Sequence, residues 1–193
     1  MTRFLLLTAT LALVATALPC AAQPRAIDPK RSTVTVRVFK SGLFRAFADD
    51  HVIEAPVAEG SLDDSDTPNV HIAIAVRDMR VLDPGLSSND RRDVQARMLG
   101  PEVLDGDRFP QIRFRSAAIQ RADEGRWSVR GDLDVHGQIH PVTVNVVREQ
   151  DHYKGSTSFK QSEFGITPIS IAGGTVKVKD EIKIDFDVVT SVR

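Results

Sequence analysis

Apolar and polar residues alternate with a period of two through most of the chain after residue 30. Such alternation puts the apolar side chains of a segment on one face and the polar ones on the other, as in a half-buried antiparallel strand. The clearest segments have as apolar members Val34, Val36 and Val38; Val70, Ile72, Ile74 and Val76; Ile112 and Phe114; Trp127, Val129, Leu133 and Val135; and Ile182, Ile184, Phe186 and Val188. We therefore expect an all-β domain.

Turn residues separate these segments at short intervals. His136-Gly137 stands between two alternating runs and predicts a tight hairpin turn. Asp123-Glu124-Gly125 and Asp151-His152 indicate two further turns. Successive strands joined by short turns favour a meander, which closes into a barrel or stacks as a sandwich.

One stretch breaks the alternation and predicts a short helical insertion around residues 89–104. Ser87-Ser88-Asn89 can cap a helix, and Val94 and Met98 lie one turn apart on one face. Gly100-Pro101 ends the helix, and the stretch to Leu104 can add a second short turn. We expect this helix to cover or flank one end of the barrel.

The amino terminus has the layout of an export signal. Arg3 precedes an apolar run over residues 4–18, and Cys20-Ala21-Ala22 places small residues at a cleavage site. We expect a signal peptide over residues 1–22 and one mature domain over residues 23–193, located in the periplasm. An uncleaved anchor is one alternative, and lipidation of Cys20 is another, which the preceding Pro19 disfavours.

Composition excludes several classes of site. Cys20 is the only cysteine, so the mature chain has no disulfide and no thiolate site. The formal net charge of -1 provides no basic surplus for nucleic acid. His136 and His140 lack a third metal ligand, and Asp63-Asp64-Ser65-Asp66 lacks the glycine and terminal glutamate of an EF-hand, so we expect no metal and no cofactor.

Three strings occur in a fixed order along the chain. They are Phe109-Pro-Gln-Ile-Arg-Phe-Arg-Ser116, Trp127-Ser-Val-Arg-Gly-Asp-Leu-Asp-Val-His-Gly-Gln-Ile-His-Pro-Val-Thr-Val144 and Ser162-Glu-Phe-Gly-Ile166. Together with the opening Ile27-Asp28-Pro29-Lys30-Arg31-Ser32, they resemble the YceI-like family of periplasmic, lipocalin-like barrels that hold a polyisoprenoid chain. The resemblance implies an extended antiparallel β-barrel with an apolar tunnel.

The resemblance also implies a function: an exported protein that sequesters or carries an isoprenoid-like lipid, a polyprenol or a quinone tail, without catalysis. Burial in a dry tube supplies about 0.8 kcal/mol per CH₂, so such a site needs no catalytic group. Our candidate tunnel residues are the inward-facing Val36, Val38, Phe44, Phe47, Ile72, Ile74, Ile112, Phe114, Trp127, Val129, Leu133, Val144, Phe159, Phe164, Ile184 and Phe186. We assign Phe44 and Phe47 either to the tunnel mouth, with transient contact to a membrane surface, or to ordinary packing.

Two other interpretations remain open on the residues alone. A close-packed barrel of about eight strands can be filled by its own side chains. The chain would then act in a stress response or through a protein contact. A third interpretation is a small periplasmic enzyme that uses His51 with Asp49 or Asp50.

Overall fold

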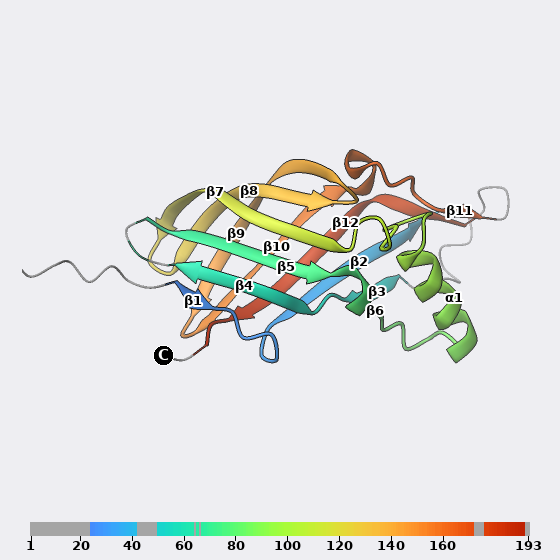
Figure 1. The fold of residues 1–193 in the computed structure, drawn as a ribbon, viewed down its shortest axis with the longest axis horizontal. Coiled ribbons are helices and arrows are strands. Elements are labelled where there is room, and N and C mark those ends of the chain that lie inside the picture. Colours follow the sequence, from blue (N-terminus) through green and yellow to red (C-terminus); the bar gives the residue numbers. More distant parts are fainter. Residues whose placement is uncertain (1–23, 42–49, 64, 66, 172–175, 192–193) are drawn as a thin grey trace, which may run out of the picture.

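The computed structural model describes residues 24–41, 50–63, 65, 67–171 and 176–191. Figure 1 shows a curled sheet with one α-helix near the end opposite the chain's carboxyl terminus. The expected signal peptide over residues 1–22 and the segment with Phe44 and Phe47 lie outside the described residues. Among the described residues, no helix is long and apolar enough to cross a membrane.

The strands are antiparallel and join into one sheet in the order β1-β4-β5-β7-β8-β9-β10-β12-β2-β3-β6, with β11 paired to β12. Their bounds are β1 Arg25–Ala26, β2 Thr33–Ser41, β3 His51–Glu54, β4 Val57–Asp63, β5 Asn69–Ala75, β6 Arg80–Val81, β7 Gln111–Asp123, β8 Arg126–Val135, β9 Gln138–Glu149, β10 His152–Lys160, β11 Ser170–Ile171 and β12 Val176–Val189. Two short 3₁₀ helices, η2 Val76–Asp78 and η3 Gln161–Phe164, complete the architecture. The expected all-β antiparallel fold with one short helix is confirmed.

The turns explain how the meander forms. His136 and Gly137 have φ angles of 52° and 73°, the left-handed pair that a two-residue type I′ hairpin requires, and they join β8 to β9. The hairpins β4–β5, β7–β8 and β9–β10 turn at the opposite end of the sheet, on the left of Figure 1. One end of the molecule is therefore built from three hairpin ends.

The amino-terminal segment joins the two sides of the curled sheet. Strand β1 pairs with β4, and the next residue, Ile27, forms a bridge to Thr190 just after β12. The amide of Asp28 donates to the carbonyl of Val189 at 2.8 Å, and the amide of Ser191 donates to the carbonyl of Ala26 at 2.8 Å. These bonds connect the two sides of the curled sheet at this seam.

The helix α1 spans Ser88–Leu99 and follows the predicted cap. The Ser87 hydroxyl accepts the amide of Asp90, and Gly100 is the carboxyl-terminal cap. The helix therefore ends before Pro101, and the rest of the expected insertion to residue 104 consists of hydrogen-bonded turns. Met98 is buried and Val94 packs against the core, so the predicted apolar face is the one that the helix buries.

Candidate functional site

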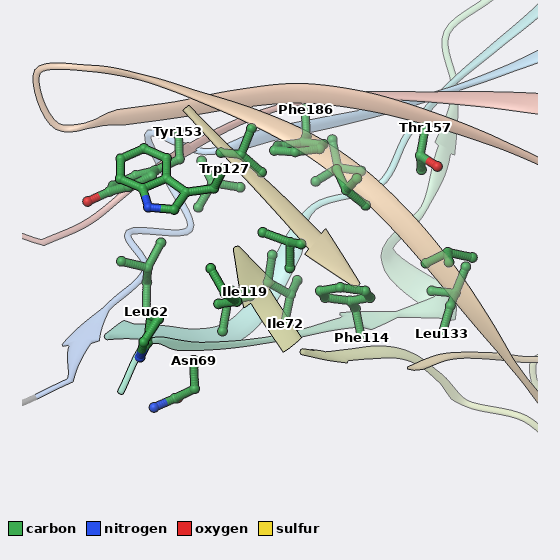
Figure 2. Close-up of a pocket in the computed structure, with 18 of the residues that line it drawn as sticks. Leu62, Asn69, Ile72, Phe114, Ile119, Trp127, Leu133, Tyr153, Thr157 and Phe186 are labelled. Carbon is green, nitrogen blue, oxygen red and sulfur yellow. The ribbon is translucent and has the colours of Figure 1, made fainter. Parts of the chain in front are cut away.

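The curled sheet encloses an apolar cavity of about 480 Å³ (Figure 2). Strands from both sides of the curl contribute to it. Its lining consists of Val34, Leu62, Asp63, Ser65, Pro68, Asn69, Val70, Ile72, Ile74, Ile112, Phe114, Ile119, Arg121, Trp127, Val129, Leu133, Val142, Val144, Val146, Arg148, Tyr153, Thr157, Ile184, Phe186 and Val188. The interior is thus not completely filled by side chains.

The cavity is elongated along the strands. Figure 2 shows Trp127, Tyr153 and Leu62 at one end, and Leu133 and Thr157 at the other. Trp127 and Leu133 lie on the same strand, β8, so the lining extends for about 20 Å at roughly 3.4 Å per residue. A chain-like ligand matches this shape better than a compact one.

Most of the sequence-predicted residues line this cavity, and the rest lie elsewhere. On the lining are Ile72, Ile74, Ile112, Phe114, Trp127, Val129, Leu133, Val144, Ile184 and Phe186. Val36 and Val38, on β2, instead pack with the hydrophobic core. Phe159 and Phe164 belong to an aromatic cluster beyond the cavity. These four pack with the hydrophobic core, and the cavity does not extend to them. The described residues do not include Phe44 and Phe47.

Other lining residues were not among our candidates. The pairing of β7 with β8 shifts between Ser116 and Ala118, which marks a β-bulge. One extra residue exchanges the two faces of a strand, so Ile119 and Arg121 line the cavity although strict alternation from Phe114 would turn them outward. The sequence carries a sign of this exchange, because the large apolar residues stand at even positions up to Phe114 and at an odd position at Ile119.

Charged groups gather at the end of the cavity formed by the three hairpin ends. Asp63 and Asn69 belong to the β4–β5 hairpin, Arg121 to β7, and Arg148 to β9. The guanidinium of Arg25 donates to the Tyr153 hydroxyl at 2.6 Å. We call Asp63, Asn69, Arg121, Arg148 and Tyr153 the polar rim.

The ionised form of Asp63 is favoured within this rim. Its Oδ1 accepts the backbone amide of Ser65 at 2.9 Å. Hydrogen bonds from the Ser65 backbone and then from its side chain lower the pKa of the Asp63 carboxyl below its ordinary value. The rim thus carries a carboxylate beside its two guanidinium groups at neutral pH.

At the end of the cavity opposite the polar rim, beyond Leu133, aromatic side chains form a packed cluster. Phe164 is fully buried, and its ring lies 4.9 Å from Phe159 and 5.1 Å from His140 between ring centroids. His136 lies 3.3 Å from the Phe164 carbonyl through Nδ1, and its ring is 4.7 Å from Phe109. We call Phe109, His136, His140, Phe159 and Phe164 the aromatic plug. Each of the three strings that resemble the YceI-like family contributes at least one residue to the aromatic plug, so these motifs stabilise the fold at this end.

The histidines therefore have structural partners. Among the described residues, no group of three or more His, Cys, Asp and Glu side chains could hold a metal ion. His51 does not lie on the cavity: its Nδ1 is 2.5 Å from Oδ2 of Asp83, and Oδ1 of Asp83 accepts the amide of Val52 at 2.7 Å. Asp83 is buried, and it takes the place expected for Asp49 or Asp50. The pair links β3 to the segment after β6.

Solved structures with a similar fold cover nearly the whole chain. BcnA of Burkholderia cenocepacia superposes with a TM-score of 0.64 at 21% identity, covering 86% of this chain and 99% of that one. A polyisoprenoid-binding domain of Saccharophagus degradans, implicated in plant cell wall breakdown, gives a TM-score of 0.55 at 11% identity, covering 87% and 98%. These likenesses establish the fold.

Sequence comparisons give the family. A UPF0312 protein of Vibrio cholerae is 25% identical over 118 residues, which span 56% of this chain and 58% of that relative. The match therefore covers little more than half the length of the curated relative. The family model described as YceI-like domain matches residues 26–190, which include every described strand except the first residue of β1. The chain belongs to the family of YceI-like domains.

Proposed function

We propose that this protein binds an isoprenoid-like lipid, the tail of a polyprenol or a quinone, in the apolar cavity and that it catalyses no reaction. The elongated cavity of about 480 Å³ carries this proposal. Its walls are mainly Val, Ile, Leu and Phe side chains, which offer a hydrocarbon chain burial without a polar partner. Family membership and the similarity to a polyisoprenoid-binding domain support the same class of ligand.

The two alternatives have weaker support. A barrel filled by its own side chains is disfavoured by the cavity itself. An enzyme built on His51 is disfavoured because His51 does not line the cavity. Its bond to the buried Asp83 links β3 to the segment after β6.

Our proposal includes export to the periplasm. The basic and apolar amino terminus and the small residues Cys20-Ala21-Ala22 support cleavage after residue 22. Intact-mass analysis of the periplasmic protein should give a chain that begins at or near Gln23. Retention of Met1, or a lipid on Cys20, would contradict this part of the proposal.

Organic extraction of the natively purified protein, followed by mass spectrometry, tests the ligand class directly. In addition, titration of delipidated protein with a polyprenol should shift or quench the emission of Trp127 saturably, because the only tryptophan lines the cavity. Recovery of no lipid, together with no saturable signal for any apolar chain, would refute lipid binding.

Matched variants connect the signal to the cavity. Leu133→Asp should abolish the response, because an unpaired carboxylate in a dry wall costs several kcal/mol. Thr157→Phe tests the same point without a buried charge, since the larger ring occupies the end of the cavity near Leu133 (Figure 2). Arg130→Ser and Ser158→Phe change outward residues on the same strands and should leave the response almost unchanged.

A further inference from the structure

The inward-facing residues of β10 mark where the cavity ends. Tyr153 and Thr157 line the cavity, and the next inward position, Phe159, belongs to the aromatic plug. Thr157 lies at the end of the cavity that is farther from Trp127 (Figure 2). Along this strand the cavity therefore ends, and the plug begins, within two residues.

The two neighbouring strands show the same boundary. On β9, Val142 lines the cavity, whereas the ring of His140, on the same face, lies 5.1 Å from that of Phe164 between centroids. On β8, Leu133 lines the cavity, whereas Val135 is buried in the hydrophobic core. We call the residues just beyond this boundary the floor of the cavity: Val135, His140, Phe159 and Phe164.

The floor is held in place by packing and by hydrogen bonds. Phe164 is fully buried, and its ring lies 4.9 Å from that of Phe159. The 3₁₀ helix η3 that carries Phe164 is fixed to β12, because the buried side chain of Gln161 donates to the Lys179 carbonyl at 2.7 Å. A tail that reaches the floor cannot extend further without breaking these contacts.

The other end of the cavity is open to solvent. Arg121 and Arg148 of the polar rim line the cavity, and both residues are exposed. A tail that is longer than the cavity therefore leaves its excess length outside.

The distance between the two ends determines how much of a tail is buried. Trp127 and Leu133 lie on β8 with about 20 Å between them, at roughly 3.4 Å per residue. An extended isoprene unit lengthens a tail by four carbon–carbon bonds of about 1.5 Å each, or roughly 5 Å along its axis. The cavity therefore has room for about four isoprene units in line.

We infer that the protein selects isoprenoid tails of up to about four units, and that Phe159 in the floor sets this limit. The inference rests on the proposed function and adds to it the length of the tail and a residue that determines specificity. Each unit inside the cavity is removed from water, whereas a further unit remains in water and adds nothing to the affinity.

Prenols that differ only in length test the limit: geraniol, farnesol, geranylgeraniol and geranylfarnesol, with two to five units. Each is added to delipidated protein as a cyclodextrin complex, and the Kd from Trp127 emission is corrected for the affinity of cyclodextrin for that prenol. In the parent, we expect Kd to fall at least about tenfold with each unit up to the fourth, because five more carbons are buried. The fifth unit should change Kd by less than about threefold.

Two variants move the limit in opposite directions. Phe159→Ala removes the ring beyond Thr157, so the fifth unit should now lower Kd about tenfold. Val142→Phe adds a ring at the same end of the cavity, so it should weaken geranylgeraniol about tenfold and farnesol less than threefold. The ratio of the variant's Kd to the parent's Kd for one prenol does not depend on the carrier.

Ser158→Ala is the matched control. Ser158 lies between Thr157 and Phe159 on β10, but it is exposed and faces outward, so this variant should keep the limit of the parent. Circular dichroism checks that each variant folds. Since Phe159→Ala and Val142→Phe test the floor independently, the loss of one fold leaves the other test intact.

The outcomes separate this inference from the proposed function. A fifth unit that strengthens binding to the parent as much as the fourth would overturn the length limit and leave lipid binding intact. A folded Phe159→Ala or Val142→Phe variant with the limit of the parent would overturn the role of the floor. If no prenol gives a saturable signal, the proposed lipid-binding function fails, and the length limit fails with it.

Discussion

Gly131 and Gly155 stand on the inner faces of β8 and β10 at positions where a side chain would collide with an aromatic ring. A Cβ atom on Gly131 would lie 2.5 Å from Cζ of Phe114 and 2.5 Å from the Arg115 carbonyl. On Gly155 it would lie 2.7 Å from Cζ of Phe186. The two glycines therefore let the rings lie flat against the wall, and space remains open between them.

Replacing Gly131 by alanine should destabilise the protein, although alanine generally suits a strand better than glycine. The added methyl group meets a backbone oxygen as well as a ring, and overpacking of this kind costs about 1–3 kcal/mol. Urea denaturation measures the free energy of unfolding. The outward neighbour Arg130→Ala is the control and should change it by less than about 0.5 kcal/mol. A Gly131→Ala variant as stable as the parent would contradict this account of the wall.

At the scale of elements, α1 protects the edge of the sheet. Strand β6 is the last strand in the order and would expose unpaired backbone groups. The side chain of Gln95 on α1 accepts the Val81 amide at 2.8 Å and donates to the Met79 carbonyl at 2.8 Å. The helix contributes no residue to the cavity lining, so it flanks the barrel at this edge and does not cover the cavity.

Gln95→Ala should cost about 1–3 kcal/mol in the free energy of unfolding, because two backbone groups next to buried side chains lose their partner. Hydrogen exchange adds a local readout: the Val81 amide should exchange faster in the variant than in the parent. Asp93→Ala, on the exposed side of the same helix, should affect neither measurement. Unchanged protection of Val81 in Gln95→Ala would show that the bond to the helix does not protect this edge.

At the scale of the whole molecule, the barrel has a packed end and an open apolar volume. The plug around Phe164 and the seam from Ile27 to Thr190 hold the sheet curled. The side chains that line the cavity lack packing partners on its side, and they gain these contacts only when a ligand fills it. The stability of the whole domain should therefore depend on bound lipid.

Saturating delipidated protein with geranylgeraniol should raise its Tm. At a free concentration of about 100 times Kd, binding adds about 2.7 kcal/mol, which corresponds to roughly 5–10 °C for a domain of this size. Differential scanning calorimetry measures the shift. In Thr157→Phe, whose cavity is partly filled, the same addition should have little effect. A parent Tm that does not change with ligand would indicate that the cavity stays empty.

Local chemistry in the sequence determined the elements. Period-two alternation predicted the strands, His136-Gly137 predicted the hairpin that the φ angles confirm, and Ser87-Ser88-Asn89 predicted a cap at the start of the helix, which the structure assigns to Ser87. These features depend on neighbouring residues only, and for that reason they can be read along the chain. The strings around Phe109, His136 and Phe164 also indicated the family to which the chain belongs.

Only the tertiary structure decided how these elements share one interior. Alternation assigns a side chain to a face but carries no information across strands, so the pairing of His51 with the distant Asp83 was not predictable. The bulge between Ser116 and Ala118 exchanged the faces of β7 and brought Ile119 and Arg121 onto the cavity. The polar rim exists because three hairpins end at one edge of a curled sheet, and the register and the curl that bring them together are properties of the whole fold.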